Sequence, residues 1–254
     1  MTLPVYYCYG LSDDSLQPGD ELSFAGAEGQ HAATVRRTKP GELIEVVDGE
    51  GTRVRLAVTA VTKGAVTGSV SSITTDPQHS PYITLVQALA KGGRDEQAIE
   101  TATEYGVDAA VPWQADRSVA RWEGAAKLTK GAARWQSTVL AAMKQSRRSW
   151  LPRVLPFVRT AELVGWVRER VASGAAVYVC HEEAQERLTD VVAAAEPGHE
   201  VVLIVGPEGG ISAAELDALA AVGARPVLLG EHVLRSSSAG PWAIAVIRAL
   251  CARL

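Results

Sequence analysis

The pattern of apolar and polar positions divides the chain near residue 80. Before that point, three segments rich in β-branched residues alternate apolar with polar side chains, and Gly-containing turns separate them. They span residues 43–47, 53–61 and 66–73. Period-two alternation between such turns is typical of β-hairpins. We therefore expect residues 1–75 to form a small β-barrel or sandwich, with one helical stretch at about residues 30–37.

The pattern changes after residues 76–81, a turn-rich stretch that contains two prolines. Beyond it, continuous apolar runs alternate with helical segments, which is typical of a parallel sheet with helices on both faces. The predicted strands are 83–89, 109–112, 176–180, 201–205 and 226–229. The predicted helices are 95–105, 123–145 and a last helix that starts near Pro241. We therefore expect a linker at 76–81 and an α/β domain over residues 82–254.

The composition is that of a folded protein without a strong charge bias. Of the 254 residues, 47% are hydrophobic and 21% are charged, and the formal net charge is -4. This disfavours a surface that grips nucleic acid on all sides, although it allows a local basic face. The three cysteines are far apart and form no C-x-x-C pair, which favours a reducing compartment. Because the sequence also has no signal-peptide pattern and no span-length apolar run, we expect a cytoplasmic protein.

The first candidate binding segment is the loop Gly206–Gly210, which follows a predicted buried strand. A helix is expected directly after it, with Ser212 as N-cap and Glu215 completing a capping box. Glycines let the backbone approach a ligand, and the helix start offers free N–H groups at the edge where α/β sheets bind ligands. The loop matches neither G-x-G-x-x-G nor G-x-x-x-x-G-K-[ST], so dinucleotide and triphosphate sites are poorly supported. An ordinary Gly-rich turn is the alternative interpretation.

The second candidate segment, residues 227–240, repeats this order of strand, glycine, long loop and helix. Arg235 and three serines would place hydroxyl and N–H donors around one point, unless the serines only cap a helix. The segment lacks G-x-S-x-G, and His232 by itself makes no catalytic triad, so a hydrolase is not supported. His181-Glu182-Glu183 is not an H-E-x-x-H motif, so we expect no metal.

Together these segments resemble the bacterial 16S ribosomal RNA uracil N3-methyltransferases of the trefoil-knot (SPOUT) class. The motifs that carry the likeness are Gly206-Pro-Glu-Gly-Gly-Ile-Ser212 and Leu228-Leu-Gly-x-x-Val-Leu-Arg235, followed by small hydroxyl residues and Ala239. Further matching positions extend the likeness over nearly the whole chain. They are Gln30-His31, Arg36-Arg37, Pro40-Gly41-Glu42, Asp48-Gly49, Lys91-Gly92, Glu96, Glu104-Tyr105-Gly106-Val107, Gln145-Ser146 and Arg148.

The resemblance implies a PUA-like N-terminal RNA-binding domain and a C-terminal domain whose last helix is threaded through a loop to form a trefoil knot. It also implies a homodimer that binds S-adenosylmethionine mainly through backbone groups. Carried over position by position, the cofactor contacts are Leu203, Ile204, Gly206, Glu208, Gly209, Gly210, Leu229, Gly230, Leu234, Ser236, Ser238 and Ala239. The implied reaction is methylation of N3 of a specific uridine in 16S ribosomal RNA of the small ribosomal subunit.

Two residues are expected to act on the uracil. Loss of the N3 proton spreads negative charge onto the flanking carbonyl oxygens, and Arg235, next to the cofactor loop, is the candidate to stabilise that charge. Glu208 either orients the base or accepts its proton, or it is a structural acceptor for loop N–H groups. The chain has Ser237 and Lys144 at two positions that are acidic in the family. We expect neither position to supply an essential base, because the sulfonium donor already has a good leaving group and the main task is alignment.

RNA is expected to contact paired basic residues. The candidates are Arg36, Arg37, Arg53 and Arg55 from the N-terminal domain, with Arg147 and Arg148 from the catalytic domain. A solvated charged surface is the alternative for each of them. Two other functions stay open: a knotted methyltransferase acting on transfer RNA or another ribosomal site, and a non-catalytic RNA-binding factor of ribosome assembly. The missing glycine fingerprint disfavours a Rossmann oxidoreductase.

Overall fold

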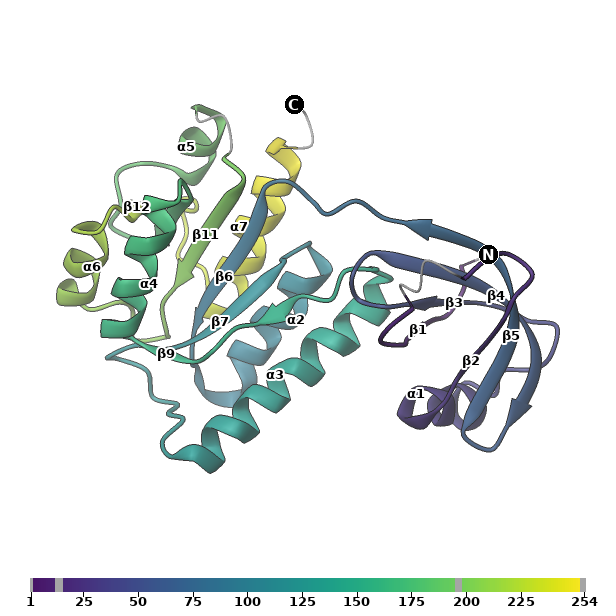
Figure 1. Ribbon diagram of the computed structural model, residues 1–254. Helices are drawn as coiled ribbons and strands as arrows, with labels where there is room; N and C mark the ends of the chain where they lie inside the picture. The colour runs from purple at the N-terminus through teal and green to yellow at the C-terminus, as the bar shows by residue number, and fades with distance from the viewer. Residues whose placement is uncertain (1, 12–15, 195–197, 252–254) are drawn as a thin grey trace. The chain divides into compact units, whose positions relative to one another are not determined.

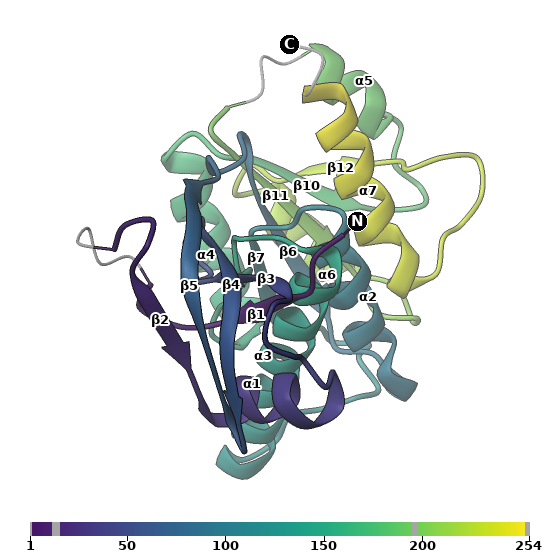
Figure 2. The same ribbon diagram turned by 90° about the vertical axis from the view of Figure 1, so that its right-hand side faces the viewer.

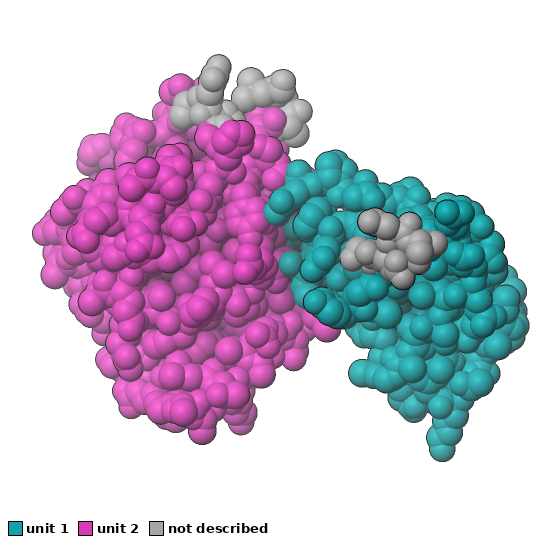
Figure 3. Space-filling view, in the orientation of Figure 1, with its two compact units in different colours: residues 1–78, 143–151 teal, residues 79–142, 152–254 magenta. Residues whose placement is uncertain are grey.

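The computed structural model describes residues 2–11, 16–194 and 198–251, and Figure 1 and Figure 2 show it from two sides. The ends of the predicted domains, residue 1 and residues 252–254, lie outside the described residues. The chain forms two compact units (Figure 3): residues 1–78 with 143–151, and residues 79–142 with 152–254. The short segment 143–151 of the first unit comes from the region that the sequence pattern assigned to the α/β domain.

Among the described residues, the first unit is built on a five-stranded sheet, and the predicted strands are confirmed. In spatial order the sheet consists of β1 (Val5–Tyr7), β3 (Leu43–Val47), β4 (Thr52–Thr62), β5 (Ala65–Thr75) and β2 (Glu21–Phe24). Neighbouring strands are antiparallel except for β1 and β3. Alternate side chains such as Ile44 and Val46 are buried in the core of this unit. The alternation in the sequence therefore reflects a sheet with one buried face.

The helical stretch of this unit begins and ends earlier than predicted. α1 (Gly26–Gln30) continues directly into a π-helical turn, η1 (His31–Val35), instead of spanning residues 30–37. Arg37 lies in the left-handed region with a φ of 54°. Because a residue in that conformation does not continue a right-handed helix, the helix ends before Arg37.

Within its described residues, the second unit contains a parallel sheet, as predicted, and it has seven strands, of which β8 and β9 were not predicted. Its spatial order is β12 (Arg225–Val227), β10 (Ala176–Cys180), β11 (Glu200–Val205), β6 (Tyr82–Ala88), β7 (Ala109–Gln114) and β8 (Arg153–Val154), and β9 (Val158–Arg159) also pairs with β7. The helices are η2 (Lys91–Gly93), α2 (Arg94–Glu104), α3 (Ala125–Ser146), α4 (Thr160–Ala172), α5 (Leu188–Ala194), α6 (Ala213–Ala220) and α7 (Ser236–Cys251). Residues 143–146 of α3 belong to the first unit.

Apolar side chains pack on both faces of the parallel sheet. On β11, Leu203 belongs to the core beneath α2, α5 and α7, whereas Ile204 belongs to the core beneath α4 and α6 (Figure 1). Consecutive residues of a strand point to opposite faces. A continuous apolar run such as residues 201–205 is therefore what a sheet covered on both sides requires.

The last helix starts about five residues earlier than predicted. α7 contains Pro241 instead of starting near it. Gly240 and Pro241 are buried, and a Cβ on Gly240 would lie 2.9 Å from a methyl carbon of Leu85 on β6. The helix thus packs closely on the sheet at this point. Pro241 has no N–H and cannot donate a hydrogen bond within the helix. The free energy gained by this packing exceeds the cost of that missing bond.

A candidate active site at the carboxyl ends of the parallel strands

A pocket of about 780 Å³ opens at the carboxyl edge of the parallel sheet. Its walls are the segment after β10, the loop Gly206–Gly210 after β11 and the segment before α7, with Arg94 and Arg117 from the segments after β6 and β7. A smaller hollow of about 110 Å³ shares residues with it and is lined mainly by Leu228–Leu234. Ligand pockets of α/β proteins commonly lie at this edge, with volumes of roughly 300–1,000 Å³.

Close contacts require the glycines of the 206–210 loop. A Cβ on Gly206 would lie 2.6 Å from Cγ1 of Ile211, and a Cβ on Gly209 would lie 3.1 Å from the Cβ of Arg117. Gly210 has a φ of 73°, a conformation that L side chains rarely adopt. The three glycines therefore present only backbone atoms to the pocket, beside the side chains of Pro207 and Glu208.

The capping box predicted at the start of α6 is confirmed. Ser212 Oγ accepts a hydrogen bond from the Glu215 N–H, and the Glu215 carboxylate accepts one from the Ser212 N–H. The same carboxylate also accepts hydrogen bonds from the Asp116 N–H (2.8 Å) and the Thr160 hydroxyl (2.7 Å). Burial alone would raise the pKa of Glu215, but these hydrogen bonds outweigh burial and hold the pKa below its ordinary value. Glu215 therefore stays charged at neutral pH and fixes the loop after β7 to the loop after β11.

Ser236 connects three segments of the chain at the pocket. Its Oγ donates a hydrogen bond to the carbonyl oxygen of Gly206 (2.8 Å) and accepts one from Nε2 of Gln87 (2.9 Å), a fully buried residue of β6. The side chain thus joins the ends of β6 and β11 to the first turn of α7. Since its hydrogen is donated within the protein, the Ser236 hydroxyl helps to build the pocket wall.

Both residues expected to act on the uracil line the pocket. Glu208 forms an ion pair with Arg94, with Nη1 and Oε1 2.9 Å apart, and its side chain is 24% exposed. Arg235 is exposed, and the described parts of the chain contain no ion-pair partner for its guanidinium. The carbonyl oxygen of Arg235 accepts hydrogen bonds from the N–H groups of Ser238 and Ala239. The Arg235 backbone is therefore fixed at the helix start, while its side chain is available to a ligand.

The structure brings most of the expected cofactor residues together. Those that line the pocket or the adjoining hollow are Gly206, Glu208, Gly209, Gly210, Leu229, Gly230, Leu234, Ser236 and Ala239. Leu203 and Ile204 lie instead in the two buried cores, and Ser238 is exposed on α7 outside the lining residues. Ser237, at one of the family's acidic positions, is buried and also lies outside the lining.

Several lining residues were not among the expected site residues. They are Arg94, Arg117, Cys180, His181, Glu182, Glu183, Val205, Pro207, Ile211, Ala213, Leu216, Leu228, Glu231, His232 and Val233. Arg94 and Arg117 follow parallel strands, so the tendency of ligands to bind at the carboxyl ends of such strands, applied to every strand, would have indicated both. Burial raises the pKa of the Cys180 thiol to about 12, so this thiol is neutral and a poor nucleophile.

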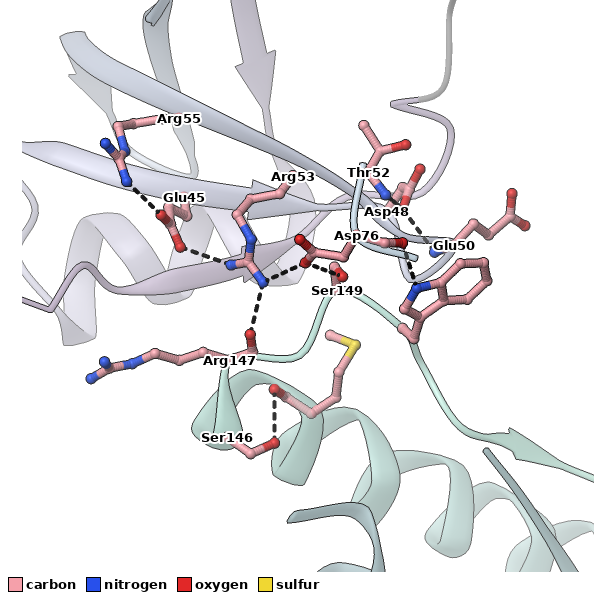
Figure 4. A network of polar contacts seen from close by, with 12 residues as sticks. Glu45, Asp48, Glu50, Thr52, Arg53, Arg55, Asp76, Ser146, Arg147 and Ser149 are labelled. Carbon is pink, nitrogen blue, oxygen red and sulfur yellow. Dashed lines mark hydrogen bonds and ion pairs between the residues drawn. The ribbon is translucent and has the colours of Figure 1, made fainter. Parts of the chain in front are cut away.

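The six arginines expected to contact RNA all belong to the first unit. Arg53 is engaged within the protein (Figure 4): Nη1 lies 2.8 Å from Glu45, and Nη2 lies 3.1 Å from Asp76 and donates to the Arg147 carbonyl oxygen at 2.9 Å. Ser149 also donates a hydrogen bond to Asp76, at 2.6 Å. Arg53 therefore holds the segment 143–151 onto the sheet of the first unit.

The remaining candidates for RNA contact are less enclosed. Arg36, Arg37 and Arg147 are exposed, and Arg148 is partly buried. Arg55 has an ion pair with Glu45 at 3.2 Å but remains 49% exposed. Figure 4 shows the side chain of Arg147 extending away from the polar network that holds its backbone. Exposed arginines with a fixed backbone are suited to phosphate contacts.

Lys144, at the second acidic position of the family, is also in the first unit. Its Nζ lies 2.5 Å from Oε1 of Glu28, and the other oxygen of Glu28 accepts a hydrogen bond from the Tyr7 N–H at 3.2 Å. The exposed fractions of the two side chains are 23% and 16%. The lysine is therefore matched by a carboxylate from α1.

The described residues contain no group of three or more His, Cys, Asp or Glu side chains that could hold a metal ion. Among the helices in that part of the chain, none has the length and apolar character needed to cross a membrane. The cysteines Cys8, Cys180 and Cys251 are free thiols.

Comparison with known proteins identifies both halves of the chain. Residues 77–248 match an RNA methyltransferase domain, and residues 24–71 match an RNA methyltransferase PUA domain. The chain is 48% identical over 228 residues to ribosomal RNA small subunit methyltransferase E of Mycobacterium bovis, covering 90% of this chain and 86% of the relative. It is 26% identical to the protein of that name from Bacillus subtilis, over 95% and 94% of the two chains.

A solved structure agrees with these relatives. Ribosomal RNA small subunit methyltransferase E from Neisseria gonorrhoeae, bound to S-adenosylmethionine, superposes with a TM-score of 0.85 at 27% identity and covers 98% of each chain. The RNA methyltransferase model alone spans most of the sequence. This chain therefore belongs to the RNA methyltransferase family that includes ribosomal RNA small subunit methyltransferase E.

Proposed function

We propose that the protein transfers a methyl group from S-adenosylmethionine to N3 of a specific uridine in 16S ribosomal RNA of the small ribosomal subunit. The observation that carries this proposal is the pocket at the carboxyl edge of the sheet, which is lined by the glycine-rich loop Gly206–Gly210 and by Arg235, whose guanidinium has no ion-pair partner among the described residues. The relatives named ribosomal RNA small subunit methyltransferase E support the choice of RNA. The cofactor bound in the structure from Neisseria gonorrhoeae supports the methyl donor.

The residues around the pocket fit such a cofactor. The donor carries no phosphate, so neither a P-loop nor a dinucleotide fingerprint is required. Gly206 and Gly209 let the loop pack closely against Ile211 and Arg117, and both glycines line the pocket, where their backbone groups can contact the ligand. Leu229, Leu234 and Ala239 offer apolar surface in the adjoining hollow. When bound, S-adenosylmethionine supplies an activated methyl group on a sulfonium.

The protein's part in the reaction is to position the uracil and to handle its charge. N3 becomes a nucleophile when its proton leaves, and the negative charge then spreads over the neighbouring carbonyl oxygens. Arg235 stabilises this charge, because its guanidinium has no carboxylate partner within the described residues. Glu208, held by Arg94, orients the base or accepts the proton. These roles require no acid at position 144 or 237.

The two departures from the family pattern are compatible with catalysis. Ser237 is buried outside the pocket lining, so an acid missing at that position removes no group from the pocket wall. Lys144 is paired with Glu28 in the first unit. Neither substitution therefore favours a non-catalytic assembly factor.

Several features of the assembly belong to the same proposal. RNA contacts come from exposed arginines of the first unit and from Arg148, while Arg53 holds the backbone of residue 147. The exposed arginines are Arg36, Arg37, Arg55 and Arg147.

The proposal also includes the topology of both units. The strands of the first unit curl into a PUA-like barrel, and α7 is threaded through a loop of the second unit to form the trefoil knot. The protein works as a homodimer in the cytoplasm. Sedimentation should give about twice the 26.9 kDa mass of one chain.

The catalytic role of Arg235 is tested by Arg235→Ala, with Arg168→Ala as the control. Arg168 is an exposed residue of α4 outside the pocket lining, so its loss removes the same charge without touching the site. We expect Arg235→Ala to leave the calorimetric Kd for S-adenosylmethionine within a factor of about three. Methyl transfer should fall by a factor of about 10² or more, which is typical for loss of a group that stabilises developing charge. Full transfer by Arg235→Ala would refute this role.

A further inference from the structure

Arg117 is held in a defined place at the pocket by contacts from two directions. The preceding residue, Asp116, donates its N–H to Glu215 (2.8 Å), and its carboxylate accepts a hydrogen bond from the Ser212 hydroxyl (3.2 Å). The side chain of Arg117 donates from Nη1 to the carbonyl oxygen of Gly209 at 3.1 Å. An exposed arginine on a loose loop would have neither the fixed backbone nor the directed guanidinium.

Arg117 has more hydrogen-bond donors than the described protein atoms use. A guanidinium has five N–H donors, and one of those on Arg117 is used by Gly209. No carboxylate forms an ion pair with Arg117 in the described ranges of the chain, whereas Arg94, on the same pocket, is paired with Glu208. Arg117 and Arg235 are thus the two pocket arginines whose positive charge is not matched by a described ion pair.

We propose that Arg117 binds a phosphate of the RNA strand next to the target nucleotide and so positions the uracil at the pocket. This inference rests on the proposed function and adds a substrate contact to it. The planar fork of a guanidinium matches two phosphate oxygens, and it gives orientation as well as charge. Arg117 is a positioning residue, because it holds the strand and does not touch the reacting atoms.

The RNA phosphate and the carboxylate of the cofactor are the two anions that Arg117 could bind, and its position in the same pocket as Arg235 is the reason for choosing the phosphate. Arg117 lines the large pocket together with Arg235, the residue proposed to act on the uracil. It does not line the adjoining hollow, where Leu229 and Gly230, two of the expected cofactor contacts, are found. Because Arg117 also donates to Gly209, one of the expected cofactor residues, the test must separate a contact to RNA from a contact to the cofactor.

The test measures RNA binding as a function of salt with the full-length protein. The probe is a fluorescently labelled RNA hairpin with uridines in its loop, titrated at several KCl concentrations. Removal of one protein–phosphate contact should reduce the slope of log Kd against log salt by about 0.7–0.9. We expect Arg117→Ala to reduce the slope by that amount and to raise the Kd for RNA about 10-fold at low salt, as removal of one charged hydrogen-bond pair does.

Two further variants separate this role from a structural one. Arg117→Lys keeps the charge, so it should retain most of the salt slope, and Arg168→Ala should behave as the unaltered protein does. The calorimetric Kd for S-adenosylmethionine should stay unchanged in all three. An unchanged slope for Arg117→Ala, or an equal loss of cofactor affinity, would overturn the proposal. The second result would assign Arg117 to the cofactor or to the Gly209 loop.

Failure of this inference is distinguishable from failure of the proposed function. If the unaltered protein binds the hairpin with a salt slope that depends on Arg117 but transfers no methyl group to small-subunit RNA, only the proposed reaction is wrong. If it methylates small-subunit RNA and the slope does not depend on Arg117, only the phosphate contact is wrong.

Discussion

The hydroxyl of Ser236 donates a hydrogen bond to the carbonyl oxygen of Gly206, 30 residues earlier in the chain and 2.8 Å away. Gln87 completes the arrangement by donating to the same hydroxyl from the buried end of β6. One side chain thus fixes the glycine loop, the central strand of the sheet and the start of α7 relative to one another. The shape of the pocket depends on this contact, because the glycine loop and the start of α7 both line the pocket.

Ser236→Ala should therefore weaken both folding and cofactor binding. The substitution removes one partner of the buried Gln87 amide, which keeps its hydrogen bond to the Ala88 carbonyl oxygen, and removes the Ser236 donor from the partly buried Gly206 carbonyl oxygen; this costs about 1–3 kcal/mol of unfolding free energy. Urea denaturation measures this loss, and calorimetry should show a higher Kd for S-adenosylmethionine. Ser238→Ala is the matched control, because Ser238 is exposed on the same helix turn and lies outside the pocket lining. Equal behaviour of the two variants would show that the Ser236 contact is not important.

Gly206→Ala should disturb the loop from within. The added Cβ would lie 2.6 Å from Cγ1 of Ile211, whose side chain is buried in the core beneath α4 and α6 and has little room to move. We expect a loss of about 1–3 kcal/mol in unfolding free energy, as for other overpacked cores. We also expect at least a 10-fold weaker cofactor affinity, measured by calorimetry.

Gly165→Ala is the control for this change. Gly165 lies within α4, and a Cβ there would meet no atom within 4 Å. The alanine should raise stability by up to about 1 kcal/mol, because it favours the helix. If Gly206→Ala unfolds at the same urea concentration as the unaltered protein and binds the cofactor equally well, the loop does not need a glycine there.

Glu215 should make stability depend on acid pH. Its pKa in the folded protein lies below the ordinary value of 4.5, because the hydrogen bonds from Asp116, Ser212 and Thr160 outweigh the effect of burial. A carboxylate whose folded pKa is lowered adds stability above its unfolded pKa, and this contribution disappears as the pH falls through the folded pKa. The stabilisation by Glu215 is therefore complete at neutral pH and declines below about pH 4.5.

Glu215→Gln keeps the shape of the side chain but replaces one acceptor oxygen by a donor that faces N–H groups. We expect a loss of about 1–3 kcal/mol at pH 7 in urea denaturation, and a smaller difference from the unaltered protein at pH 4. Glu100→Gln, at an exposed position of α2, should show no comparable effect. A difference that is the same at pH 7 and pH 4 would contradict the lowered pKa.

Arg248 should be a major determinant of how α7 packs in the second unit. Its guanidinium lies 2.5 Å from the Asp108 carboxylate and donates to the carbonyl oxygens of Pro81 and Gly106. Arg248→Met leaves Asp108 buried without this cation, which costs about 3–5 kcal/mol. Combining it with Asp108→Asn should cost less than the sum of the two single changes in urea denaturation. Strict additivity would show that the pair does not interact.

The parallel sheet and the cap of α6 could be predicted because their signals are local. The run 201–205 is apolar at every position because β11 is covered on both faces, and Ser212 and Glu215 lie three residues apart in a capping box. The start of α7 could not be predicted in this way. Ser236 begins the helix through contacts with Gln87 and Gly206, which lie 149 and 30 residues away in the chain.

The same limit applies to individual arginines. Arg53 and Arg147 look alike in sequence, but the first is enclosed by Glu45, Asp76 and a carbonyl oxygen 94 residues away, while the second is exposed. Arg117 reaches the pocket because the preceding residue, Asp116, is held by Glu215, which lies 99 residues after Asp116 in the chain. The spacing of residues along a sequence does not show which distant residues contact each other in the fold. The sequence therefore could not show which of the candidate arginines are free to contact RNA.

The most direct test of the central proposal is transfer of labelled methyl from S-adenosylmethionine to small ribosomal subunits from cells that lack the N3 modification. The modified nucleoside is then identified by mass spectrometry. We expect a single 3-methyluridine in 16S ribosomal RNA, formed by the unaltered protein and by Arg168→Ala but not by Arg235→Ala. Methyl transfer to another nucleoside would contradict the proposed reaction. The absence of methyl transfer to subunits verified as unmodified, with the cofactor bound to the protein, would contradict it as well.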